Sequence, residues 1–224
     1  RGEVPWSRDA RAAGGNSGPG AETIGSPAAD PWVTTVGAST QDRTFQATVT
    51  LGNLASYTGA SVTPATGEPF EIVDSEDAGS ELCIPGELDP AAVAGKIVLC
   101  KRGVIARVDK SHAVQLAGGV GMVLYNPDDL QALVTDNHFV PSVHINFTNG
   151  SAVKDYIAAP GTATAEISAG SPAADPGSVM ADFSSRGPNG AAGDIIKPDV
   201  TAPGVNILAG NTPTPFISRP GELF

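Results

Sequence analysis

The sequence has few aromatic residues, more acids than bases and no long apolar run. Phe, Trp and Tyr make up 5% of its 224 residues, so a core must consist mainly of Val, Ile, Leu and Ala. Thirteen Lys and Arg residues against 24 Asp and Glu residues give a net charge of −11, which would repel nucleic acids and anionic membranes. No apolar run approaches the roughly 18 residues that span a bilayer. We therefore expect no nucleic-acid partner and no membrane partner.

Several familiar catalytic and metal-binding motifs are absent. The sequence contains no GxSxG nucleophile motif, no P-loop, no HExxH zinc motif and no CxxC pair. His138 and His144, with Asp136 nearby, could form a metal site, but we expect these histidines to be structural. The acidic stretch at 74–81 lacks the spacing of an EF-hand. We predict no metal and no cofactor.

Only two cysteines are present, Cys83 and Cys100, with 16 residues between them. The three histidines do not complete a zinc site with these thiols at any usual spacing. In a secreted protein the pair would form a disulfide, which would stabilise the fold by about 3 kcal/mol. Two buried free thiols are the alternative, and the residues alone leave both open.

Glycine and proline are abundant, at 27 and 19 positions, which excludes a helical bundle and favours strands joined by many turns. Apolar runs predict strands, and apolar residues at helical spacing predict two helices. The expected strands are 32–36, 44–51, 96–100, 122–125, 140–145 and 162–167, and the expected helices are 105–117 and 151–159. The strand, helix and strand within 96–125 predict a βαβ crossover with parallel strands.

One asparagine is flanked by glycines, in the segment 14–19 (GGNSGP). The side-chain amide of Asn16 is a neutral double donor, which suits the stabilisation of an oxyanion as it forms. An Asx turn at the end of a strand is the alternative interpretation of so short a motif. The rest of the sequence must decide between them.

Two groups of segments resemble subtilisin-like serine proteases (subtilases). One group surrounds Asn16, and the other is similar to the two strands that precede the nucleophile of that family. These segments are 16–19 (NSGP), 26–28 (SPA), 32–38 (WVTTVGA), 183–189 (FSSRGPN) and 197–208 (KPDVTAPGVNIL). The middle of the chain resembles the protease-associated (PA) domain inserted at this point in many large subtilases. Its segments are 95–103 (GKIVLCKRG), 117–126 (AGGVGMVLYN) and 138–141 (HFVP).

The resemblance implies an α/β, strand-rich fold with two parts. A PA domain, which is a β-sandwich or open barrel flanked by short helices, would be inserted in an incomplete subtilisin-like doubly wound α/β domain. We expect residues 1–54 to be a catalytic-domain segment that carries Asn16. Residues 55–172 would be the PA domain, and 173–224 would be the catalytic-domain segment before the nucleophile.

The resemblance also implies roles for particular residues. Asn16 matches the oxyanion-hole asparagine, which donates to the tetrahedral intermediate. The residues that match the substrate-bordering strand and the surroundings of the primary specificity pocket are Ala13, Gly14, Gly15, Ser26 and Pro27. Cys83 and Cys100 match a cysteine pair of PA domains in this subgroup.

The family's catalytic residues are not found in this chain. Its Asp and His segments precede the oxyanion asparagine and its Ser segment follows. We expect all three outside residues 1–224, so the chain alone should have no peptidase activity.

The expected parent is therefore a secreted serine endopeptidase that acts on polypeptide substrates, with its secretion signal outside this sequence. Its PA domain would modulate substrate access or self-association. In the chain as given, the flanking segments lack the rest of their parallel sheet, and their exposed strand edges also favour self-association. Two alternatives stay open. The protein could be a non-catalytic PA-type module that binds peptides or proteins, or an inactive subtilase homologue.

Overall fold

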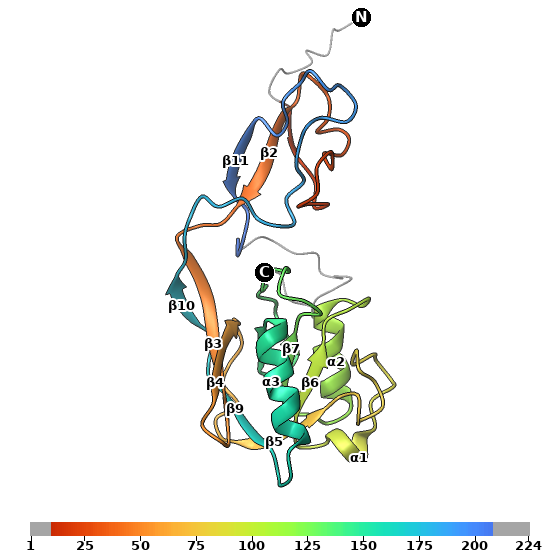
Figure 1. Ribbon diagram of the computed structural model, residues 1–224, viewed down its shortest axis with the longest axis vertical. Coiled ribbons are helices and arrows are strands. Elements are labelled where there is room, and N and C mark those ends of the chain that lie inside the picture. The colour runs from red at the N-terminus through yellow and green to blue at the C-terminus, as the bar shows by residue number, and fades with distance from the viewer. Residues whose placement is uncertain (1–9, 208–224) are drawn as a thin grey trace, which may run out of the picture. The chain divides into compact units, whose positions relative to one another are not determined.

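The computed structural model describes residues 10–207, which form two compact units (Figure 1). Residues 45–173 form one unit, here called the barrel unit. Residues 10–44 and 174–207 form the other, here called the flank unit. No helix in the described range is long and apolar enough to cross a membrane.

Seven strands of the described chain close into a ring in the order β3-β4-β8-β7-β6-β5-β9, because β9 pairs with both β5 and β3. They are β3 (Arg43–Leu51), β4 (Ser56–Ala60), β5 (Phe70–Asp74), β6 (Ile97–Lys101), β7 (Gly121–Tyr125), β8 (Ser142–Ile145) and β9 (Thr164–Ile167). β5 to β8 run parallel, and the other neighbours are antiparallel. β10 (Ser171–Ala174) pairs with β3 outside this ring. The expected sandwich or open barrel is thus a closed barrel.

The central parallel strands β6 and β7 are buried on both faces, which explains their apolar runs IVLC and MVLY. Ile97, Leu99 and Val123 belong to one core cluster, which α3 (Phe147–Ala158) joins through Val153. The alternate residues of β6 and β7 enter a second cluster with α2 (Arg107–Leu116) and the short α1 (Pro90–Val93). The barrel unit therefore has its own hydrophobic core.

The predicted βαβ crossover is confirmed, since β6, α2 and β7 follow in order and the two strands pair in parallel from Ile97↔Gly121 to Lys101↔Tyr125. The helix predicted at 151–159 begins earlier, at Phe147. Its start is set by Asn146, whose side-chain oxygen accepts a hydrogen bond from the Asn149 N–H at 2.9 Å.

The flank unit contains a three-stranded parallel sheet in the order β1-β2-β11. Its strands are β1 (Arg11–Ala13), β2 (Thr34–Ser39) and β11 (Val200–Pro203). The resemblance suggested a strand at 183–189, and this prediction is wrong, because these residues adopt turns and irregular backbone. They hydrogen-bond with the loop that contains Asn16 instead of joining the sheet. The last residue of the motif at 197–208 lies outside the described range.

The two segments of the flank unit meet where the chain enters and leaves the barrel unit. The Thr40 N–H donates to the Val179 carbonyl at 2.8 Å, and the Asp175 N–H donates to the Asp42 carbonyl at 3.3 Å. The Thr40 hydroxyl also donates to the Pro176 carbonyl at 2.6 Å. The barrel unit is thus an insertion between two adjacent points of the flank unit.

Candidate functional site

Asn16 lies in the loop that follows β1, and two backbone hydrogen bonds fix the start of this loop. The Gly14 N–H donates to the Val36 carbonyl of β2 at 2.9 Å, and the Gly14 carbonyl accepts from the Gly25 N–H at 3.2 Å. The second bond brings the residues predicted to border the substrate, 13–15, next to the turn that contains Ser26 and Pro27. The predicted substrate-binding residues therefore gather at one place in the flank unit.

The segment at 183–187 holds the Asn16 loop from the other side. The Gly18 N–H donates to the Phe183 carbonyl at 3.0 Å, and the Ser185 N–H donates to the Gly15 carbonyl at 3.0 Å. The Ser17 N–H donates to the Ser185 hydroxyl at 3.1 Å. Asn16 itself is exposed, and no hydrogen bond within residues 10–207 engages its carboxamide. Its amide is therefore free to donate to a ligand.

Two glycines make this close approach possible. Gly15 has a φ of +114°, and a Cβ there would lie 2.7 Å from the Ser185 hydroxyl oxygen. A Cβ on Gly18 would lie 2.1 Å from the Ser184 carbonyl oxygen. Larger residues would displace the loop, so the glycines beside Asn16 have a steric reason in addition to their flexibility.

An ion pair between the buried Lys197 and the exposed Asp199 ties β2 to the segment before β11. The Lys197 ammonium donates to the Val33 carbonyl at 2.6 Å and to the Asp199 carboxylate at 2.8 Å. The same carboxylate accepts the Thr35 N–H at 2.6 Å. The Lys197 hydrogen bond, helped by the Thr35 N–H, lowers the pKa of Asp199. Sequence reasoning assigned no role to this pair, because its partners are more than 160 residues away.

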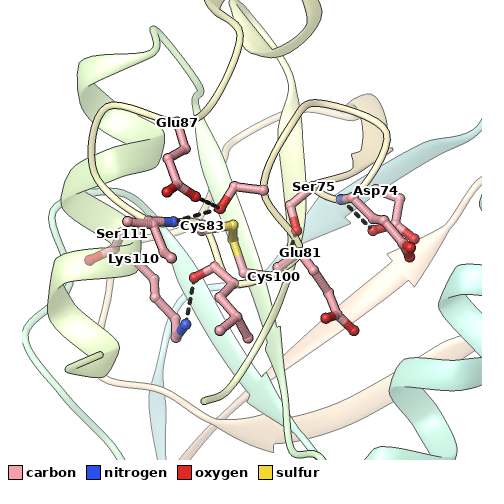
Figure 2. The surroundings of a disulfide bond; sticks show 12 residues. Asp74, Ser75, Glu81, Cys83, Glu87, Cys100, Lys110 and Ser111 are labelled. Carbon is pink, nitrogen blue, oxygen red and sulfur yellow. Dashed lines mark hydrogen bonds between the residues drawn. A yellow bond between two sulfur atoms is a disulfide. The ribbon is translucent and has the colours of Figure 1, made fainter. Parts of the chain in front are cut away.

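In the barrel unit, Cys83 and Cys100 form a disulfide that joins the loop at 75–89 to β6 (Figure 2). Both cysteines are fully buried. Beside them the side chain of Lys110, from α2, is also fully buried and donates to the Leu82 carbonyl. Burial lowers the pKa of Lys110 to about 8. The sequence pattern of α2 gave no sign of a lysine in this core.

Two lysines pair with three of the four acidic side chains at 74–81. The Lys154 ammonium contacts Asp74 at 3.1 Å and Glu76 at 2.6 Å, and the Lys101 ammonium contacts Glu81 at 2.7 Å. The hydrogen bond and charge of Lys154 lower the pKa of Glu76. Three carboxylates of the stretch therefore already have a lysine of this chain as their partner.

The two histidines considered as metal ligands make separate contacts. His144 Nδ1 accepts the Val134 N–H at 3.0 Å, and His144 Nε2 donates to the Asn126 side-chain oxygen at 2.8 Å. Burial lowers the pKa of His144 to about 3, so this ring is neutral. His138 Nδ1 contacts the Ser111 hydroxyl at 3.0 Å. Between residues 10 and 207, no group of three His, Cys, Asp or Glu side chains is placed to hold a metal ion.

Comparison with known proteins gives a family match inside the barrel unit and similar proteases over most of the chain. The PA domain family matches residues 49–153, within the barrel unit. The subtilisin-like protease SBT1.4 of Arabidopsis thaliana is 47% identical over 208 residues, which are 88% of this chain and 26% of that protein. SBT1.7 of the same plant is 41% identical over 208 residues, 88% of this chain and 27% of that protein. The chain spans about a quarter of the length of the curated relatives it matches.

Solved structures are less similar. A subtilisin-like protease, Apa1, from the Antarctic bacterium Pseudoalteromonas sp. AS-11 is 18% identical, with a TM-score of 0.43 over 78% of this chain and 51% of that chain. An aminopeptidase from Aneurinibacillus sp. strain AM-1 is 21% identical, with a TM-score of 0.42 over 62% of this chain and 34% of that chain. These values are too low to establish a common fold over the whole chain.

The PA-domain match lies within the barrel unit, so the closed ring of seven strands is the fold of this PA domain. The similarity to the plant proteases covers 88% of the chain, so it extends beyond the family match at 49–153. The chain is a PA-domain-containing segment related to the subtilisin-like proteases, which confirms the resemblance seen in the sequence.

Proposed function

We propose that the parent of this chain is a subtilisin-like serine endopeptidase that hydrolyses polypeptides. In this proposal the Asn16 side-chain N–H donates to the carbonyl oxygen of the scissile bond as that oxygen gains negative charge. The catalytic Ser, His and Asp would be supplied by parts of the parent outside this chain. The observation that carries the proposal is the exposed Asn16 carboxamide on a loop that is held from both sides.

The surroundings of Asn16 support an extended polypeptide as the substrate. β1 pairs with β2 on one side only within the described residues, so its other edge offers unpaired backbone groups. An extended peptide can add to such an edge as a further strand. Ala13, Gly14 and Gly15 would then border the substrate, and the exposed turn at Ser26 and Pro27 would lie beside its side chains.

The domain assignment and the role of the PA domain are part of the same proposal. The proposed boundaries are residues 1–54 and 173–224 for the catalytic domain and residues 55–172 for the PA domain, whereas the barrel unit described above begins at Phe45. The PA domain would control substrate access or self-association. A secreted location is supported by the Cys83–Cys100 disulfide, because such bonds persist in oxidising compartments.

The test is covalent labelling of the full-length parent protein with a fluorophosphonate, which reacts with activated serine hydroxyls. We expect labelling of one serine and hydrolysis of a chromogenic peptide, with both lost after heat denaturation. If the folded protein binds peptides without cleaving them and takes up no label, the parent is a binding module or an inactive homologue instead.

A further inference from the structure

We propose that Ser185 is a positioning residue for Asn16, an inference that rests on the proposed function. Ser185 is fully buried in the segment that faces the Asn16 loop. Its hydroxyl accepts the Ser17 N–H at 3.1 Å, and its own N–H donates to the Gly15 carbonyl at 3.0 Å. Ser185 therefore binds the two peptide groups on either side of the Asn16 Cα.

These two hydrogen bonds restrain the φ and ψ torsions of Asn16, which set the direction of its side chain. The Gly15 carbonyl belongs to the peptide group before Asn16, and the Ser17 N–H belongs to the one after it. With both held by one buried residue, neither the φ nor the ψ of Asn16 can change without breaking a hydrogen bond to Ser185. Asn16 has no such bond through its own side chain within residues 10–207, so its direction depends on this backbone anchor.

Anchoring matters because an oxyanion donor acts over a narrow range of distances. Donors must lie about 2.7–3.1 Å from the oxygen in the transition state. A displacement of about 1 Å can lower the rate by about a hundredfold. Loss of the Ser185 hydroxyl removes one of the two anchors and leaves the other, so we expect a smaller loss of about tenfold in kcat.

The neighbouring residue provides a matched control. Ser184 is buried to the same degree and lies in the same segment. Its hydroxyl, however, accepts the Ala38 N–H of β2 at 3.0 Å and does not contact the Asn16 loop. Ser184→Ala therefore removes one buried hydroxyl from this segment without removing an anchor of Asn16.

The experiment is a double-mutant cycle in the full-length protein, with kcat and KM measured on a chromogenic peptide. We expect Ser185→Ala to lower kcat about tenfold when Asn16 is present and less than about twofold when it is combined with Asn16→Ala, because it acts through Asn16. Ser184→Ala should lower the thermal midpoint by a similar amount and leave kcat within about twofold of wild type. KM should change little in either single variant.

Each other outcome has a definite meaning. An equal loss of kcat from Ser185→Ala with and without Asn16, or an equal loss from Ser184→Ala, would overturn the positioning role. If Asn16→Ala itself leaves kcat unchanged, the proposed function fails and this inference with it. If Ser185→Ala does not fold, Ser185→Cys keeps the shape with a weaker acceptor, and the same cycle applies with a loss smaller than tenfold.

Discussion

Each unit contains a buried lysine, Lys197 in the flank unit and Lys110 in the barrel unit, and the two charges are satisfied differently. Lys197 is matched by the Asp199 carboxylate, so its charge is compensated inside the flank unit. Lys110 donates to the Leu82 carbonyl, and its side chain is completely buried in the barrel unit. The first lysine should therefore stabilise through its ion pair, whereas the charge of the second should oppose folding.

Asp199→Asn tests the ion pair. The amide keeps an oxygen for the Thr35 N–H but leaves the buried Lys197 ammonium without a countercharge. We expect the free energy of unfolding at pH 7 to fall by about 0.5–1 kcal/mol, because solvent screens the exposed Asp199 carboxylate. The folded pKa of Asp199 lies below 3.8, so this contribution is present above that value and is lost as the pH falls through the folded pKa.

Denaturant unfolding at pH 7 and at successive lower pH values measures both effects. Asp194→Asn removes an exposed carboxylate from the same unit and serves as the control. An Asp199→Asn effect that is equal at neutral and strongly acidic pH would argue against a charge-dependent bond.

Lys110→Met tests the cost of the buried ammonium. The folded pKa is about 8, below the usual 10.5, so the unfolded chain binds more protons between these values. The stability of the wild type should therefore rise relative to that of the variant as the pH increases from 8 to 10.5. Thermal midpoints of both proteins across this range provide the measurement, and parallel curves would contradict a depressed pKa.

The prediction of most site residues rested on the family resemblance, because local sequence patterns did not indicate them. The glycine-flanked Asn16 is visible in the sequence, because glycine permits a close approach of backbone. The residues that hold it are not visible, since Ser185 lies 168 positions from Ser17. Such partners follow from the fold, which the local sequence does not specify.

At the scale of elements, the predictions succeeded where a strand is buried on both faces. β6 and β7 are short apolar runs that end at turns, and α2 between them shows helical spacing of its apolar residues. β4 and β10 were missed because SYTGA and SPAA contain no alternating apolar residues. They become strands through pairing with β3, which is a tertiary effect.

The disulfide is the element-scale feature that is most readily tested. It joins the loop at 75–89, which has little regular structure, to the buried strand β6. Replacing Cys83 and Cys100 together by Ala should lower the free energy of unfolding by about 3 kcal/mol, mainly through greater freedom of the unfolded chain. Urea unfolding of the barrel unit, in the variant and in the reduced wild type, measures this loss of stability. An unchanged urea midpoint would contradict the expectation.

At the scale of the whole molecule, the barrel unit is an insertion in the sequence of the flank unit. The flank-unit segments that precede and follow the insertion lie side by side, held by bonds between Thr40 and Val179 and between Asp42 and Asp175. The flank unit should therefore not need the barrel unit to bring its two segments together.

Replacing residues 45–173 of the full-length parent by a short Gly-Ser linker tests this independence. We expect hydrolysis of a small chromogenic peptide to be retained within a fewfold, while cleavage of folded protein substrates or the oligomeric state changes. Size-exclusion chromatography and the two activity assays supply the readouts. Loss of small-peptide hydrolysis in a protein that is still folded would show that the PA domain is part of the catalytic site itself.

The most direct test of the central claim is the kcat of Asn16→Ala in the full-length parent protein. Removing an oxyanion-hole donor of this kind from subtilisin lowers kcat by about 10²–10³. We predict a loss in that range at nearly constant KM, while Asn53→Ala, in an exposed turn of the barrel unit, retains wild-type kinetics. An Asn16→Ala variant with wild-type kcat would contradict the assignment of this loop as the oxyanion site.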